Sequence, residues 1–219
     1  MAVTLDIVSA ILREYQNIHG LAPQKHGKLP TSHAEIPVRT SKLKPLIEVR
    51  GYADRIHLFE AEYDGMHIVA QIQVMGVLGQ PYNTSGVANI YLAQNLNLCW
   101  QRFATCKEMF HCMIDRLDAQ RVTSLKQLKE LLSLLAEDTT ALTGEAAAFT
   151  SERVAELYAL ETLFPVEFRM VHLDDFLSGS LTASDIAGMY RIPEVYVHLA
   201  FEKRYLDTVT RLRGKLISI

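Results

Sequence analysis

Three residues in one short segment carry the side chains best suited to chemistry. The segment runs RFATCKEMFH from Arg102 to His111 and contains Lys107, Glu108 and His111. Residues four apart lie on one face of a helix, so Lys107 and His111 should point to the same side. Two histidines at these positions could hold one zinc ion, and the adjacent glutamate could act as general base toward a metal-bound water. Here a lysine holds the first position.

Lysine changes the chemistry expected of this segment. An ammonium group has no lone pair to offer a metal, and lysine is not among the usual zinc ligands. Lys107 could bind zinc only as a neutral amine, which would require a large depression of its pKa. We therefore expect loss of the zinc site. We also expect the Lys107 ammonium to take the place of a metal ion and to pair with Glu108 or with a downstream carboxylate.

Two interpretations of His111 stay open at this point. It could be a former metal ligand that faces a cleft with Glu108, or a hydrogen-bonded core histidine. Cys106 and Cys112 flank it but do not share its helix face, so a Cys/His zinc site from this helix alone is geometrically poor. Cys106 should serve packing, because it lies on an apolar stripe whose members are Phe103, Cys106, Phe110, Met113 and Leu117. His19, His26 and His33, at equal intervals in a polar segment, favour a solvated loop over a metal cluster.

The same segment resembles the core helix of the ImmA/IrrE-like metallopeptidases, a zincin family with the motif Arg-Phe-(Thr)-x-x-His-Glu-x-x-His. Arg102, Phe103, Glu108 and His111 match this motif. The family takes a third ligand from a later helix of the form Glu-Ala-x-x-Phe-Ala-x-x-Leu-Leu-x-Pro. That outline recurs over residues 154–165, with Val154 at the ligand position. The resemblance spans roughly residues 55–205 and rests on the order of elements more than on any one motif.

The resemblance implies roles for several of these residues. If zinc is bound, its ligands would be His111 with Glu152 or Glu156, and Glu108 would be the catalytic base. Arg102 would be a binding residue. Because Lys107 and Val154 stand at ligand positions, we expect no cofactor unless the zinc site is intact in three dimensions.

The family further implies an ancestral role in cleaving or binding a helix-turn-helix repressor, often in phage or mobile-element regulation. We expect weak or no peptidase activity and a present role in transcription regulation by binding a protein partner.

Two alternative functions from other classes of protein remain open. The first is an active zinc endopeptidase with unusual ligands, His111 with Glu152 or Glu156 and one more. The second is a DNA-binding regulator, because residues 182–199 fit a helix-turn-helix pattern. Its phosphate contacts would come from the basic residues that follow, Arg204, Arg211, Arg213 and Lys215. The second helix would begin with the acidic Glu194 and has few base-reading groups at its front, which favours a packing role for the helix pair.

Hydrophobic spacing predicts the elements that position these residues. Alternating apolar residues on both sides of Asp64-Gly65 predict a hairpin of strands 55–63 and 66–78, with a third strand at 87–95, in a small and mostly antiparallel sheet. Helical periodicity predicts helices with these ranges: 4–18; 98–118; 124–138; 150–164, capped by Thr150 or Ser151; and 182–212, broken at Ile192-Pro193. Residues 19–37 should form a loop.

The fold class is therefore α+β and, from the resemblance, zincin-like. We divide the chain into an N-terminal helix and loop extension (1–50), a metallopeptidase-related core (51–180) and a C-terminal helical pair (181–219). A formal net charge of −3 shows no overall basic excess of the kind that nucleic-acid binding needs. Three cysteines between positions 99 and 112 argue against a disulfide framework. No apolar run could span a bilayer and no signal peptide is recognised, so we expect a cytoplasmic protein without a membrane partner.

Overall fold

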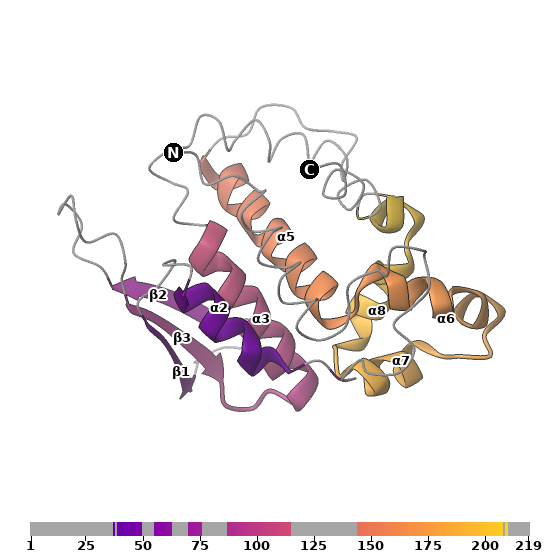
Figure 1. Ribbon diagram of the computed structural model, residues 1–219, viewed down its shortest axis with the longest axis horizontal. Helices are drawn as coiled ribbons and strands as arrows, with labels where there is room; N and C mark the ends of the chain where they lie inside the picture. Colours follow the sequence, from indigo (N-terminus) through magenta and orange to yellow (C-terminus); the bar gives the residue numbers. More distant parts are fainter. Residues whose placement is uncertain are drawn as a thin grey trace.

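A three-stranded sheet lies at one end of the molecule, and helices make up most of the rest (Figure 1). The chain is α+β, as predicted. The computed structural model describes residues 37, 39–49, 55–62, 70–75, 87–114, 144–207 and 209. The predicted helices at 4–18 and 124–138, the Asp64-Gly65 turn and the three loop histidines lie outside these residues.

The sheet is mixed, with the order β1-β3-β2. Strand β1 (Arg55–Ala61) runs parallel to β3 (Val87–Ala93), with Arg55 opposite Val87. Strand β2 (Ala70–Met75) runs antiparallel to β3, with Ala70 opposite Leu92. The expectation of a mostly antiparallel sheet is therefore wrong for the β1–β3 pair.

The predicted hairpin is also wrong, because β3 lies between the two strands that were expected to pair. Burial gives the physical reason. In β3 the consecutive residues Ala88, Asn89 and Ile90 are all buried, which suits a strand covered on both faces. In β1 only Ile56 is fully buried, and Leu58 is 47% exposed. The more buried strand takes the centre of the sheet, and β1 takes an edge.

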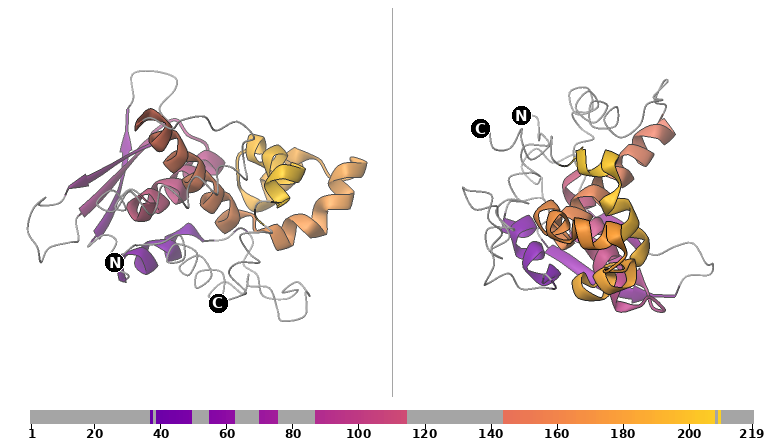
Figure 2. Two further views of the ribbon diagram at one scale, coloured as in Figure 1. Left: turned by 90° about the horizontal axis from the view of Figure 1, so that it is seen from above. Right: turned by 90° about the vertical axis from the view of Figure 1, so that its right-hand side faces the viewer.

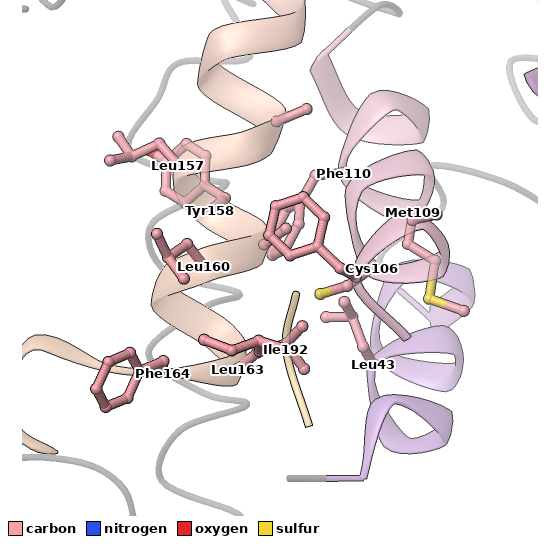
Figure 3. Packing of buried hydrophobic residues seen from close by; sticks show 14 of the residues in the cluster. Leu43, Cys106, Met109, Phe110, Leu157, Tyr158, Leu160, Leu163, Phe164 and Ile192 are labelled. Carbon is pink, nitrogen blue, oxygen red and sulfur yellow. The ribbon is translucent and has the colours of Figure 1, made fainter. Parts of the chain in front are cut away.

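Helix α3 (Leu98–Ile114) packs against β2 and β3 on one side and against α5 (Gly144–Leu163) on the other. The Asn97 side chain accepts a hydrogen bond from the Trp100 backbone N–H, as an N-cap does. Phe103, Cys106, Phe110 and Met113 of the predicted apolar stripe are buried. Figure 3 shows this layer, in which the rings of Phe110 and Tyr158 stack 5.5 Å apart.

Helix α5 begins at Gly144, so the predicted cap at Thr150 or Ser151 is wrong. It ends before Pro165, as predicted, because proline cannot continue the helical hydrogen bonds. Proline 165 then precedes α6 (Val166–Ser178), a helix that the sequence patterns did not predict. Gly179 ends α6 with a positive φ of 77°, which glycine adopts without strain.

Helices α7 (Ala183–Tyr190) and α8 (Glu194–Phe201) form the predicted pair with its break at Ile192-Pro193. Thr182 and Asp185 form a reciprocal capping box at the start of α7. The expected longer second helix is interrupted, because Glu202 is extended and the helical conformation resumes at residue 203.

The N-terminal part of the described chain joins the same core. Following the short 3₁₀ turn Thr40–Lys42, α2 (Leu43–Val49) packs on α3 and β1. One buried apolar cluster includes Leu43 of α2, Phe110 of α3 and Val197 of α8. Residues from all three predicted divisions of the chain (1–50, 51–180 and 181–219) therefore contribute to one core. None of the helices described is both long and apolar enough to cross a membrane.

Candidate functional site

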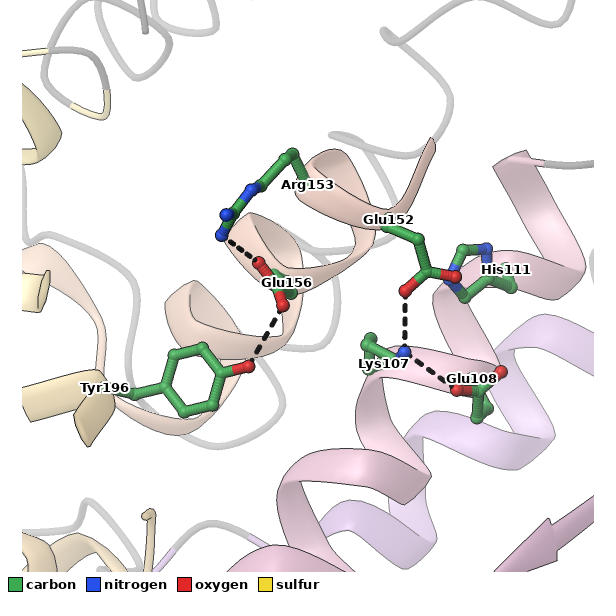
Figure 4. Close-up of polar contacts among 7 residues, drawn as sticks. All are labelled: Lys107, Glu108, His111, Glu152, Arg153, Glu156 and Tyr196. Carbon is green, nitrogen blue, oxygen red and sulfur yellow. Dashed lines mark hydrogen bonds and ion pairs between the residues drawn. The ribbon is translucent and has the colours of Figure 1, made fainter. Parts of the chain in front are cut away.

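Helix α3 presents Lys107, Glu108 and His111 close to Glu152 of α5 (Figure 4). The side chains of Glu108 and His111 are each only 4% exposed, and that of Lys107 is 19% exposed. Buried polar groups are costly unless they find partners. The partners of these three side chains therefore define the site.

Glu152 of α5 completes the group. Its Oε2 lies 2.7 Å from Lys107 Nζ, and its Oε1 lies 3.1 Å from His111 Nε2. Lys107 Nζ is also 3.1 Å from Glu108 Oε1. One ammonium thus bridges two carboxylates, and one of these carboxylates bridges the lysine and the histidine. We call Lys107, Glu108, His111 and Glu152 the Lys107 cluster. The pairing predicted for Lys107 is found with both Glu108 and a downstream carboxylate.

The electrostatics of the cluster hold its main ion pair in the charged form. The hydrogen bond with His111 and that with Lys107 outweigh burial and lower the pKa of Glu152 to about 2. Burial acts to lower the pKa of Lys107, but the charges and hydrogen bonds of Glu108 and Glu152 outweigh it, so the pKa is raised. At neutral pH the lysine is therefore an ammonium and Glu152 a carboxylate.

The residues of this cluster do not fit a zinc ion. A metal needs lone pairs, and Lys107 instead places an ammonium here whose N–H groups point at the available carboxylates. Among the residues described, no group of three or more histidine, cysteine, aspartate or glutamate side chains is arranged to hold a metal ion.

Glu156, the other acidic residue proposed as a ligand, lies one turn further along α5 and has different partners. It accepts hydrogen bonds from the Tyr196 hydroxyl at 3.0 Å and from Arg153 at 2.8 Å (Figure 4). Burial raises the pKa of the Tyr196 phenol, so this hydroxyl remains a donor. The Tyr196 ring stacks on Phe103 with centroids 3.8 Å apart. Glu156 therefore links α5 to α8 and is outside the Lys107 cluster.

Two further predicted residues also lie outside the cluster. The Nε of Arg102 donates to the backbone carbonyl of Arg191 at 3.2 Å, which ties α3 to the turn between α7 and α8. Val154, at the position that the resemblance gives to the third ligand, is fully buried in the core. Cys106 is buried as expected, and burial raises the pKa of its thiol to about 12.

The ion pair between α5 and α6 was not predicted. Glu161 pairs with Arg169 of α6, and the Nε of Arg169 donates to the Phe164 carbonyl at 2.7 Å. The guanidinium also lies over the rings of Phe164 and Tyr205. The Arg169 side chain is fully buried. No spacing rule links two residues eight apart across a helix break, so the sequence carried no signal for this pair.

The helix pair α7–α8 contributes to packing. Ile186 of α7 and Val197 and Ala200 of α8 are fully buried. Arg191 between the helices adopts a left-handed conformation with φ 51°. The exposed start of α8 carries Glu194, whose charge opposes a phosphate backbone. Of the basic residues proposed to contact phosphates, only the exposed Arg204 lies within the residues described.

Comparison with known proteins gave no match. No protein-family model matches the chain, and neither a curated protein nor a solved structure shows significant similarity to it.

Proposed function

We propose that this protein is a degenerate relative of the ImmA/IrrE-like metallopeptidases that regulates by binding a protein partner without cleaving it. In this proposal the fold is zincin-like and α3 is the former metal-binding helix. The Lys107 ammonium occupies the place of the zinc ion, and His111 and Glu152 are former ligands. The observation that carries the proposal is the position of Lys107 Nζ, within 3.1 Å of both Glu108 and Glu152.

The charges of the cluster support this substitution. A zincin site gathers a general-base carboxylate and ligand groups around a cation. Here a carboxylate next to the lysine and a carboxylate from a later helix converge on a different cation. Removing a metal from such a site would leave Glu108 buried with an uncompensated charge, which is costly. A lysine at position 107 supplies the missing positive charge from within the chain.

The same contacts argue against hydrolysis. A general base must be free to accept a proton from an activated water. Glu108 is almost fully buried, and its Oε1 is in an ion pair with Lys107. An ammonium also cannot lower the pKa of a bound water as zinc does. What these residues can still provide is a surface for recognition, since the Glu152 carboxylate is half exposed.

The partner follows from the resemblance alone and is a helix-turn-helix repressor. The family cleaves or binds such repressors, and a chain that has lost its metal can retain the binding step. No described contact favours the active-peptidase or DNA-binding alternative over this one.

Metal analysis of the untagged protein and of Lys107→His tests the proposal. The substitution restores two histidines one turn apart beside Glu152, so we expect the variant to bind about one zinc ion while the wild type binds none. Lys107→His combined with Glu152→Gln is the matched control and should lose that zinc. Zinc bound stoichiometrically by the wild type, and lost in Lys107→Ala, would refute the proposal.

A second experiment separates binding from cleavage. The wild type is incubated with a helix-turn-helix repressor encoded beside it, and both complex formation and repressor length are followed. We expect a complex and an intact repressor, unchanged by chelator and by Glu108→Gln. Repressor cleavage that either treatment blocks would show an active metallopeptidase.

A further inference from the structure

Helix α6 carries a second surface suited to a partner, at the end of the molecule opposite the sheet (Figures 1 and 2). It follows the C-terminal end of α5, whereas Glu152 lies near the middle of that helix, about three turns before its last residue. The surface is therefore separate from the Lys107 cluster, and the inference does not depend on the proposed function.

The inner face of α6 is anchored firmly. Phe168 is buried against Tyr190 of α7, and Phe176 stacks on Phe201 of α8 with ring centroids 4.3 Å apart. Arg169 holds its buried ion pair on the same face. These contacts fix the orientation of α6 without help from its outer residues. The outer face is thus presented on a rigid helix, which lowers the entropic cost of binding.

The outer face of α6 carries large apolar side chains in water. Met170 is 55% exposed, Val171 is 47% exposed and Leu177 is 71% exposed. At about 100° per residue Met170 and Leu177 lie within about 20° of each other, on the side away from Phe168, and Val171 lies about 100° from Met170. A single exposed apolar residue needs no explanation, but a solvent-facing helix side is normally polar. We call Met170, Val171 and Leu177, with the acidic residues Glu167, Asp174 and Asp175 beside them, the α6 outer face.

The negative charge of the α6 outer face limits the kinds of partner that could bind it. Asp174 and Asp175 are exposed and Glu167 is partly exposed. Over residues 166–190 the only lysine or arginine is Arg169, which is buried in its pair with Glu161. A second copy of this chain, packed through the same face, would bring these carboxylates together, and like charges at an interface are strongly disfavoured. Nucleic acid and anionic lipid are repelled for the same reason.

We propose that the α6 outer face is a docking site for a cationic amphipathic helix of a partner protein. The apolar side chains of such a helix would lie on Met170 and Leu177, and its lysines or arginines would meet the exposed Asp174, which lies one helical turn from each of these two residues. Laying an apolar helix face onto an apolar surface is a common mode of recognition. The 13 residues of α6 span about 20 Å, which limits the contact to a few helical turns and favours a transient complex.

The test uses the full chain and three fluorescent helical peptides of equal length. One combines leucine and lysine at helical spacing, one replaces the lysines by glutamate, and one replaces the leucines by serine. We expect only the leucine–lysine peptide to bind, with an affinity that falls as salt rises, because added ions screen the exposed charges. Equal binding by either other peptide, or no binding by the leucine–lysine peptide, would overturn the proposal.

Variants locate the binding surface. Met170→Ser with Leu177→Ser should weaken the leucine–lysine peptide roughly tenfold or more, since apolar anchors carry most of the energy of an interface. Asp174→Lys should weaken it in the same direction. Val195→Ser on α8 removes another exposed valine, 60% exposed, and is the matched control that should leave binding unchanged. All four positions are exposed, and circular dichroism checks the fold of each variant.

Two outcomes of these measurements would contradict the assignment. Unchanged affinity in Met170→Ser with Leu177→Ser would place the peptide elsewhere on the molecule. Self-association of the wild type that disappears in this double variant would make a second copy of the chain the occupant of the face.

Discussion

Helix α5 forms ion pairs with two neighbouring helices, α3 and α6, and these two pairs differ in burial and in composition. Near the middle of α5, Glu152 is half exposed and shares contacts with Lys107 and His111. Near its end, Glu161 meets Arg169, whose side chain is fully buried and enclosed by aromatic rings. The second pair has the features of a buried ion pair that stabilises the packing of α6 against α5. The first brings four ionisable groups to a partly open position, which a purely structural role does not require.

The comparison shows why burial alone does not identify a site. The most buried charged residue of the described chain, Arg169, is explained by packing and by its carboxylate and carbonyl partners. Lys107 is less buried, yet it gathers two carboxylates and a histidine in one partly exposed cluster. Substitutions at these two ion pairs of α5 should therefore separate stability from binding.

The largest expected effect is on stability, from Arg169→Met. This change leaves the Glu161 carboxylate buried without its cation, and breaking a buried pair from one side lowers the free energy of unfolding by about 3–5 kcal/mol. Urea denaturation followed by circular dichroism measures it. Arg169→Met combined with Glu161→Met should be less destabilised than Arg169→Met alone, because both charges are gone. A double variant less stable than the single one would contradict this account of the pair.

Lys107→Met should have an intermediate effect. The methionine keeps the aliphatic packing but leaves Glu108 buried and without its cation, which lowers the free energy of unfolding by about 1–3 kcal/mol. Arg153→Met is the matched control, since the Arg153–Glu156 pair is a more exposed pair three residues apart and should contribute about 0.5 kcal/mol or less. Equal losses in the two variants would mean that the Lys107 cluster is an ordinary surface ion pair.

The smallest expected effect is a pH dependence that comes from Glu152. Its pKa is lowered from 4.5 to about 2 in the folded chain, so its contribution to stability is full above about pH 4.5 and is lost as the pH falls toward 2. Because the side chain is half exposed, solvent screening keeps this contribution to about 1 kcal/mol or less. The difference in free energy of unfolding between wild type and Glu152→Gln, measured across this range, should shrink on acidification.

At high pH the contribution of Lys107 to stability changes with pH in the opposite direction. The pKa of Lys107 is raised above its ordinary 10.5, so its stabilising contribution is present below that pH and is lost only as the pH rises further. A stability difference for Glu152→Gln that grows on acidification would contradict the ion-pair geometry.

Local patterns predicted the elements that have one clear periodicity. The apolar stripe through Phe103, Cys106 and Phe110 indicated α3, and Pro165 indicated the end of α5. Helix α6 was missed because Met170 and Leu177 place apolar residues on its exposed side and obscure the helical period. The strand order was also missed, since alternation within a strand indicates which faces it buries and says nothing of its neighbours.

The pairing of Lys107 with carboxylates was predictable because an ammonium beside Glu108 on a helix must find an acidic partner when it is partly buried. The sequence did not predict that Lys107 would pair with Glu152 and not with Glu156. Both residues lie on the same side of α5 one turn apart, and their partners depend on where that helix crosses α3 and where Tyr196 of α8 meets it.

The amino-acid sequence alone determined the chemical types at the site, a lysine, a glutamate and a histidine at helical spacing, because these follow from covalent identity and the pitch of a helix. Only the tertiary structure decided that β3 separates β1 from β2, that Glu152 completes the Lys107 cluster, and that α6 leaves its outer face in water. These features depend on the packing of elements distant in the chain, and no local spacing encodes the angle or the depth at which two helices meet.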